Sequence, residues 1–265
     1  MNPGGKGANQ AVASARLGGN TTFICKTGND IFGRQSVELF KAEGIDTASM
    51  FSDPINPSGV ALITVDESAE NCIVVASGAN AALSISDIQQ VQQVINKAAI
   101  VLLQLEIPLS TVEFVATTAF VNGSKVILNP APACALPDDL FAHISIITPN
   151  EKEAEMLSGI KVTDINSAKK AAQIIKSKGA GSVIITMGAA GALILEQDVF
   201  THVPATIVVA VDTTAAGDVF NGALAVALAE DKNLAEATAF ACSAAAIAVT
   251  RLGAQSSAPY RKELS

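Results

Sequence analysis

The sequence predicts an α/β protein built on a doubly wound, mainly parallel sheet with helices on both faces. From residue 84 onward, apolar segments of strand length alternate with segments of helix length. This alternation implies right-handed crossovers between parallel strands. The apolar segments are continuous, which is typical of strands covered on both faces. A chain of 265 residues can bury a sizeable core, so residues 1–265 are expected to form a single α/β domain.

The first elements are expected to be a helix, a strand and a second helix. Residues 8–17 are small and predict a helix that ends at Gly18, and residues 21–26 predict a short strand. Asp30 is a suitable cap for a helix that runs to about Glu43.

Residues 46–78 have a different character. Short apolar runs at 60–65 and 72–75 flank a polar turn at 66–71, and no helix lies between them. These two runs are therefore expected to pair as antiparallel strands. We interpret residues 46–78 as a small β lid inserted into the larger domain.

The remainder of the chain supplies the alternating part of the pattern. Helices are predicted over residues 86–97, 109–121, 151–157 and 165–178, and parallel strands over 100–105, 125–128, 144–148 and 182–186. An antiparallel pair at 191–196 and 199–207 and two Ala-rich helices, at about 215–229 and 234–250, complete the predicted fold.

The composition excludes several classes of partner. Lys and Arg number 17 against 25 Asp and Glu, so the net charge is −8. A surface of this sign repels nucleic-acid phosphates and anionic lipids. Aromatic residues make up only 4% of the chain, with no Trp, which disfavours modules that stack bases. We expect no nucleic-acid partner, and a phosphorylated ligand must be held by local donors.

The sequence also indicates a cytoplasmic protein without zinc. The four cysteines form no C-x-x-C pair and the two histidines are not at ligand spacing, so free thiols in a reducing compartment are expected. No apolar run is long enough to span a membrane, and the first residues lack the apolar core of a signal peptide.

Polar residues follow several predicted strands, at the sheet edge where α/β proteins bind ligands. Glu106, Asn150 and Thr186 occupy such positions, and the segment 212–218, DTTAAGD, precedes a helix. Small residues at a helix start leave the first N–H groups accessible to an anion. Asp218 at the edge of this anion hole is suited to accept a proton from an attacking hydroxyl. The alternative is a small-residue helix start with Asp218 as a first-turn acid.

Two further Gly-rich segments do not match the common nucleotide-binding motifs. Residues 4–9, GGKGAN, fit neither the P-loop nor the G-x-G-x-x-G pattern, and residues 188–191 lack the third glycine. In the first segment Lys6 and Asn9 provide a cation and an amide, which suit a hydroxyl-rich ligand. A plain tight turn is the alternative interpretation.

Together these segments resemble the PfkB (ribokinase-like) family of carbohydrate and nucleoside kinases. The resemblance is carried by GGKGANQA at residues 4–11 and by DTTAAGD at 212–218, which is followed by NGAL at 221–224. NEKE at 150–153 is similar to the family's Asn-x-x-Glu motif. The resemblance to this family extends from residue 1 to about 262 and implies a ribokinase-like fold.

The resemblance implies a role for each matching residue. Asp218 is expected to deprotonate the sugar hydroxyl, beside a backbone anion hole made by Ala215, Ala216 and Gly217. The sugar hydroxyls are expected to contact Gly5, Lys6, Asn9 and Glu106.

The resemblance also implies sites for the nucleotide and for cations. Asn150 and Glu153 are expected to position phosphate and Mg²⁺, mostly through water, and Gly217 to contact the phosphate. The nucleotide is expected along Thr186, Met187, Gly188, Ala189, Ala190 and Gly191. A monovalent cation, usually K⁺, is expected in a loop formed by Asp212, Thr214, Ala248, Arg251, Gly253 and Ser257.

The implied activity is the ATP-dependent phosphorylation of D-ribose at its 5-hydroxyl, which gives ribose 5-phosphate. Two alternatives stay open: a kinase of the same family acting on another sugar or a nucleoside, and a catalytically impaired protein that only binds ligand. The lid is expected to cover the sugar and to mediate a homodimer.

The sequence departs from the family pattern at its amino-terminal end. The pattern has a further segment before the Gly-Gly motif, with a first strand and an Asn-x-Asp that contacts the sugar. We therefore expect a sheet with exposed strand edges, together with weakened or absent activity and poor solubility. An assay beside an amino-terminally extended chain tests this expectation.

Overall fold

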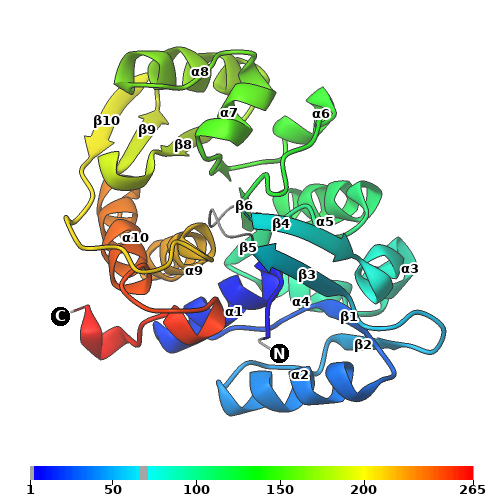
Figure 1. Ribbon diagram of the computed structural model, residues 1–265. Coiled ribbons are helices and arrows are strands. Elements are labelled where there is room, and N and C mark those ends of the chain that lie inside the picture. The colour runs from blue at the N-terminus through cyan, green and yellow to red at the C-terminus, as the bar shows by residue number, and fades with distance from the viewer. Residues whose placement is uncertain (1–2, 66–70, 265) are drawn as a thin grey trace.

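The computed structural model describes residues 3–65 and 71–264, and a six-stranded sheet runs through the centre of the molecule (Figure 1). The strand order is β10-β9-β8-β7-β6-β5. Within this sheet β5, β6, β7 and β8 are parallel to one another. β9 is antiparallel to both of its neighbours, β8 and β10. Their bounds are β5 (Ile100–Leu103), β6 (Lys125–Leu128), β7 (Ile146–Ile147), β8 (Ser182–Thr186), β9 (Ala192–Glu196) and β10 (Val199–Val203).

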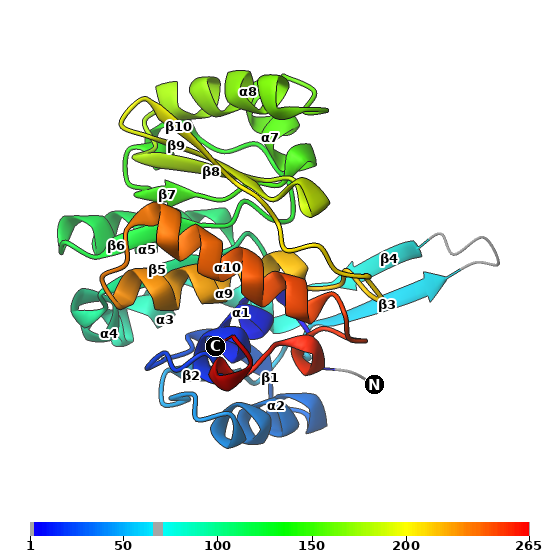
Figure 2. The same cartoon turned by 90° about the vertical axis from the view of Figure 1, so that its left-hand side faces the viewer.

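Alternate side chains of these strands pack into two separate cores. On β6, Ile127 belongs to one core, whereas Val126 and Leu128 belong to the other. The first core contains the helices α1 (Lys6–Arg16), α9 (Ala216–Ala229) and α10 (Leu234–Ala248), which Figure 2 shows on one side of the sheet. The second contains α3 (Ile85–Gln90), α4 (Gln92–Lys97), α5 (Leu109–Val121), α6 (Asp138–Phe141), α7 (Glu151–Ser158) and α8 (Ile165–Ser177). Because both faces of the sheet are covered, the inner strands β6, β7, β8 and β9 are largely apolar, as predicted, whereas the edge strand β10 contains Thr201 and His202 and is mostly exposed.

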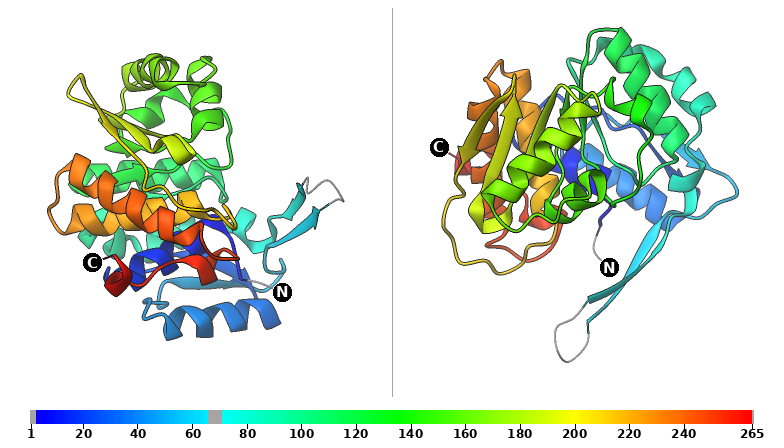
Figure 3. Two further views of the ribbon diagram at one scale, coloured as in Figure 1. Left: turned by 60° about the vertical axis from the view of Figure 1, so that its left-hand side comes forward. Right: turned by 90° about the horizontal axis from the view of Figure 1, so that it is seen from above.

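Two smaller pairs of strands lie outside the central sheet. β1 (Cys25–Gly28) pairs in parallel with β2 (Met50–Asp53), and α2 (Ile31–Ala42) follows β1. β3 (Val60–Val65) and β4 (Asn71–Ala76) form the predicted antiparallel hairpin, which projects from the body of the protein (Figures 2 and 3). The predicted turn between them falls mostly on residues 66–70, outside the described residues.

Several elements differ from the prediction. The strand predicted at 21–26 is observed as β1 at Cys25–Gly28, the strand predicted at 144–148 is reduced to β7, and α6 was not predicted. β2 was not expected, and the helix predicted over 86–97 is divided into α3 and α4 at Val91, whose ψ of 14° is not helical. β10 ends at Val203 because Pro204 follows, and proline has no N–H for a strand ladder.

A cavity with a mixed apolar and polar lining lies between β1 and β5 and reaches the predicted site residues Gly5 and Glu106. Among the described strands, β1 pairs only with β2 and β5 only with β6, so each has an edge without a neighbouring strand. The cavity has a volume of about 770 Å³ and is lined by residues that include Phe23, Cys25, Ile100 and Leu102.

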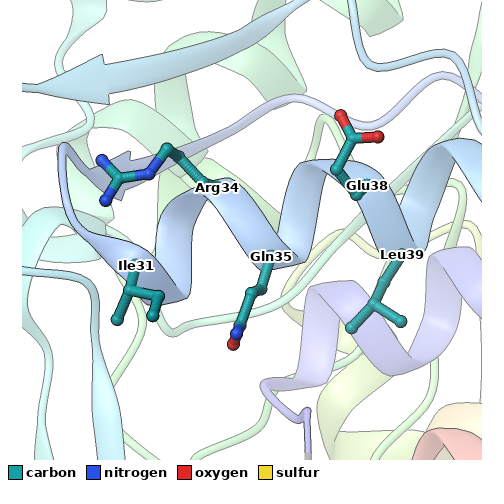
Figure 4. Close-up of a pocket in the computed structure, with 5 residues that line it drawn as sticks. All are labelled: Ile31, Arg34, Gln35, Glu38 and Leu39. Carbon is teal, nitrogen blue, oxygen red and sulfur yellow. The ribbon is translucent and has the colours of Figure 1, made fainter.

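A second hollow lies on the outer surface of α2 and contains none of the predicted site residues. It has a volume of about 560 Å³, and its five lining residues all belong to this helix: Ile31, Arg34, Gln35, Glu38 and Leu39 (Figure 4).

Candidate active site

Asp218 lies on the first turn of α9 and is held by two amides from α1. Its side chain is buried, with only 6% of the residue exposed. Asn9 Nδ2 donates to Asp218 Oδ2 at 2.8 Å, and Gln10 Nε2 donates to Asp218 Oδ1 at 3.0 Å. The carboxylate therefore faces polar groups of α1, and the two motifs at opposite ends of the chain meet at this point.

The close contact between α1 and α9 depends on Gly222. A Cβ atom at this position would lie 2.7 Å from the carbonyl oxygen of Gln10 and 2.8 Å from the Cβ of Ala13. Ser14 Oγ bridges the helices by donating to the carbonyl oxygens of Gln10 at 2.9 Å and Gly222 at 3.3 Å. A residue without a side chain is thus required where the helices cross.

Lys6 and Glu106 meet near the start of α1. The backbone N–H of Lys6 donates to Glu106 Oε2 at 2.7 Å. Gly5, which precedes the helix, has φ of 97°, a conformation that favours glycine. The positive φ turns the chain into α1 and brings the predicted sugar-binding residues Gly5, Lys6 and Glu106 together.

Three carboxylates of the site share an environment that disfavours their charged forms. Burial raises the pKa of Asp218, and the donated hydrogen bonds of Asn9 and Gln10 and the charge of Lys6 oppose this rise. Burial also raises the pKa of Glu106 and of Glu153, and in both cases the charge of Asp218 adds to the rise and that of Lys6 opposes it. The site therefore brings three acids close to the cation of Lys6.

The start of α9 presents unpaired N–H groups. Ala215 caps the helix in a left-handed conformation, with φ of 60°, and no side chain caps it. The N–H of Ala216 donates to the carbonyl oxygen of Thr213 at 3.2 Å. Within residues 3–65 and 71–264, the N–H groups of Gly217 and Asp218 have no acceptor. Gly217 is exposed, and no atom lies within 4 Å of where its Cβ would be.

The geometry therefore differs from the predicted anion hole at Ala216, whose amide is already occupied. The other two predicted amides, those of Ala215 and Gly217, have no acceptor among the described residues. The same holds for the N–H of Asp218, which the sequence analysis did not assign to this role.

Asp212 joins the loop before α9 to the loop after α10. Its Oδ1 accepts from the N–H of Thr214 at 2.8 Å and its Oδ2 accepts from the N–H of Gly253 at 2.9 Å. The side-chain hydroxyl of Thr214 is the largest cause that lowers the pKa of Asp212, followed by the N–H groups of Gly253 and Thr214. Ser257, in the same region of the chain, is fully buried and its Oγ donates to the carbonyl oxygen of Ala254 at 2.8 Å.

The other residues predicted for this cation loop lie nearby in the chain. Ala248 is buried at the end of α10, and the guanidinium of Arg251 forms an ion pair with Glu263. The side chain of Arg251 is thus directed to another carboxylate.

Asn150 and Glu153 form a capping box at the start of α7. Asn150 Oδ1 accepts from the N–H of Glu153 at 2.9 Å, and Glu153 Oε2 accepts from the N–H of Asn150 at 2.8 Å. This arrangement anchors the start of α7 next to β8, because Asn150 forms a bridge with Thr186.

The segment predicted along the nucleotide follows β8. Met187 is buried, whereas Gly188, Ala189 and Ala190 are exposed in a short 3₁₀ turn. At Gly191, φ is 90° and a Cβ atom would lie 2.1 Å from the carbonyl oxygen of Val203. The turn therefore needs glycine to lie against the end of β10.

Over residues 3–65 and 71–264, no three His, Cys, Asp or Glu side chains are grouped as they would be around a metal ion. In the same ranges, each helix is too short or too polar to cross a bilayer.

The fold and the site together define a carbohydrate kinase. Residues 1–261 match the profile of the pfkB family carbohydrate kinases, and the chain belongs to this family. It is 49% identical over 260 residues to the ribokinase of Haemophilus influenzae, an alignment that covers 98% of this chain and 85% of that protein.

Solved ribokinase structures share the fold. That of Thermotoga maritima is 42% identical, with a TM-score of 0.90 and coverage of 99% of this chain and 86% of that one. That of Arabidopsis thaliana, complexed with ribose and ATP, is 32% identical, with a TM-score of 0.92 and coverage of 98% and 86%. The predicted family and the predicted ribokinase-like α/β fold are confirmed.

Proposed function

We propose that this chain catalyses the ATP-dependent phosphorylation of D-ribose at the 5-hydroxyl, and that Asp218 is the base. The observation that carries the proposal is the position of Asp218: a buried carboxylate held by Asn9 and Gln10, beside the unpaired N–H groups at the start of α9. The relatives named above, one of them complexed with ribose and ATP, support this choice of substrates.

In the proposed reaction, Asp218 accepts the proton of the 5-hydroxyl. The hydroxyl oxygen forms a bond to the γ-phosphorus of ATP while the bond from that phosphorus to the β–γ bridging oxygen breaks, leaving ADP. The N–H groups of Gly217 and Asp218 stabilise the negative charge of the transferred group. A positioned base typically contributes about 10²–10⁴-fold to the rate.

The sugar is proposed to bind through Gly5, Lys6, Asn9 and Glu106. Asn9 supplies a specific argument, because its Oδ1 is buried and has no hydrogen-bond partner among the described residues. A buried acceptor without a partner costs stability unless a ligand donates to it. A sugar hydroxyl is a donor of the required kind, whereas a nucleobase would favour apolar or aromatic walls.

Mg²⁺ is proposed to accompany ATP near Asn150 and Glu153. Carboxylate and amide oxygens are ligands that Mg²⁺ prefers, and Glu153 is buried with only one of its oxygens in the capping box. The ion would neutralise phosphate charge that an acidic protein cannot neutralise. The turn at residues 186–191 is proposed to lie along the nucleotide.

A K⁺ ion is proposed in the loop around Asp212. Carboxylate, hydroxyl and carbonyl oxygens fit such a cation, and Asp212 already ties Thr214 to Gly253. The backbone carbonyls of Thr214, Ala248, Arg251 and Gly253 and the hydroxyl of Ser257 would complete the set. We expect a higher kcat in K⁺ than in Na⁺ buffer, and equal rates would contradict this assignment.

The proposal is tested by measuring ADP formation with D-ribose, D-fructose and adenosine, and by identifying the product with D-ribose. We expect D-ribose to give the highest kcat/KM and ribose 5-phosphate to form. A higher value for fructose or adenosine would favour another kinase of the same family. A rise in melting temperature with D-ribose but no turnover would favour a protein that only binds ligand.

The proposed location is the cytoplasm, in keeping with the free cysteines.

A further inference from the structure

Gln10 is a buried amide whose polar atoms all have partners. Only 1% of the residue is exposed. Its Nε2 donates to Asp218 Oδ1 at 3.0 Å and to Asn129 Oδ1 at 3.1 Å, and its Oε1 accepts from Gln104 Nε2 at 2.5 Å.

These partners determine the orientation of the Gln10 amide. A carboxylate only accepts hydrogen bonds, so Asp218 requires Nε2 on its side. Asn129 Nδ2 donates to the carbonyl oxygen of Thr148 at 3.3 Å, which turns Asn129 Oδ1 toward Gln10. A reversed Gln10 amide would place its oxygen against two acceptors.

We propose that Gln10 is a positioning residue that fixes the orientation of the Asp218 carboxylate, and that Gln104 and Asn129 act on Asp218 through Gln10. This inference rests on the proposed function, because it assumes that Asp218 is the base. Gln10 itself contacts neither the sugar nor the nucleotide in this assignment.

The same network reaches the other side of the first turn of α9. Thr148 Oγ1 donates to Asn221 Oδ1 at 2.6 Å, and Asn221 Nδ2 donates to the carbonyl oxygen of Gly217 at 2.8 Å. Gln104, Asn129 and Thr148 each lie just beyond the carboxyl end of a strand, β5, β6 and β7 respectively. Three neighbouring strands therefore hold both the base and the anion hole at a fixed position over the sheet edge.

The charges around Asp218 make the role of Gln10 measurable. The charge of Lys6 on α1 lowers the pKa of Asp218. The nearby carboxylates are Glu106 after β5 and Glu153 on α7, whose own pKa values are raised by the charge of Asp218. Burial raises the pKa of Asp218 and the Gln10 N–H opposes that rise. Removing this N–H must therefore raise the pKa of Asp218 further and move the acid limb of the kcat profile to higher pH.

The test compares the wild type with Gln10→Leu, which keeps the side-chain volume and removes the amide. We expect kcat to fall about 10- to 100-fold, as for the loss of a hydrogen bond to a charged group, with KM for ribose changed less than about threefold. A ¹³C NMR titration of the Asp218 carboxyl, assigned with Asp218→Asn, is expected to give a higher pKa in Gln10→Leu. The NMR measurement needs no substrate.

Two further variants, Gln104→Leu and Thr111→Val, distinguish an effect on Asp218 from a general loss of stability. Gln104→Leu leaves Gln10 in place and is expected to change kcat and the acid limb in the same direction by a smaller amount. Added to Gln10→Leu it should change kcat no further, because both act on one group. Thr111→Val removes a buried hydrogen bond to the carbonyl oxygen of Leu83, and should leave kcat and its pH profile unchanged.

An unchanged Asp218 pKa in folded Gln10→Leu, or a raised KM with unchanged kcat, would overturn the inference. Absence of ribose turnover by the wild type would instead contradict the proposed function. In that case the NMR titration would still decide whether Gln10 controls Asp218.

Discussion

At the scale of single residues, Ala215 has a backbone conformation that its side chain disfavours. Its φ of 60° is in the left-handed region, where a Cβ atom costs about 1–2 kcal/mol. Ala215 is the N-cap of α9 and lies directly before the first turn, where the N–H groups of Gly217 and Asp218 have no acceptor among the described residues. Unusual backbone of this kind often occurs at functional sites, where the surrounding structure maintains it.

We therefore predict that Ala215→Gly stabilises the protein by about 0.5–1 kcal/mol, since glycine removes the clash but gains entropy when unfolded. Thermal unfolding measures this. Ala239→Gly, at an exposed position within α10, is the matched control, and it should lower the free energy of unfolding by about 1 kcal/mol. An equal loss in both variants would contradict the account of Ala215.

Glu153 provides a prediction that depends on pH. Burial raises its pKa, so the folded state is penalised once this carboxyl is ionised, and the stability of the protein falls as pH rises through that pKa. Glu153→Gln removes the penalty and retains a side chain suited to the capping box. We expect Glu153→Gln to be more stable than the wild type at pH 7–8, with a higher melting temperature.

The gain from Glu153→Gln should vanish below the ordinary pKa of a glutamate, where the wild-type side chain is also neutral. Melting temperatures of both proteins between about pH 4 and 8 provide the measurement. A gain that persists at acid pH, or a loss at neutral pH, would show that burial of the charge is not the controlling effect.

At the scale of elements, the packing of α1 against α9 positions the catalytic groups. Gly222 permits the contact, and any side chain there meets the backbone of Gln10 and Ser14. Ordinarily, replacing a glycine within a helix would favour the helix by about 1 kcal/mol. Here the steric clash is expected to outweigh that gain.

We predict that Gly222→Val destabilises the protein by about 1–3 kcal/mol, as for an overpacked core, and lowers kcat because Asn9 and Gln10 move away from Asp218. Chemical denaturation and steady-state kinetics measure the two effects. Ala229→Val, at the exposed end of α9, should change stability by less than about 0.5 kcal/mol. Comparable losses in both variants would remove the special role of Gly222.

The sequence predicted the central elements because their apolar runs are long and continuous. It did not predict β2, since Met50–Asp53 is short, mixed in polarity and pairs with a strand more than twenty residues earlier. The small residues at the start of α9 drew attention to Asp218, and the Gly-rich segment 4–9 drew attention to Lys6 and Asn9.

Other parts of the site depend on contacts that a sequence does not contain. Gln10 stands beside Asn9 in the motif, but only the crossing of α1 and α9 shows that it also donates to Asp218. The occupied amide of Ala216 likewise follows from the fold of the preceding turn, where Thr213 supplies the acceptor.

At the scale of the whole molecule, the β3–β4 hairpin stands apart from the two cores (Figure 3). A two-stranded hairpin is only marginally stable alone, and Val75 on β4 is 60% exposed. These features support the expectation from the sequence that residues 46–78 act as a lid and that the hairpin mediates a homodimer.

Val75→Lys is therefore predicted to shift the protein toward monomer, because a charge replaces an apolar contact. Sedimentation velocity over a range of concentrations tests this. Val121→Lys, which changes a valine of α5 that is 75% exposed, serves as the control and should leave the assembly state unchanged. A wild type that is monomeric throughout would contradict the proposed dimer.

The account as a whole depends on proton transfer to Asp218. The most direct test is the kcat of Asp218→Asn for ribose phosphorylation, measured together with the affinity for ribose. Asparagine keeps the size of the side chain but cannot accept the proton, so kcat should fall by about 10²–10⁴-fold while ribose affinity changes only a few-fold. A kcat within about tenfold of the wild-type value would contradict the assignment of Asp218 as the base.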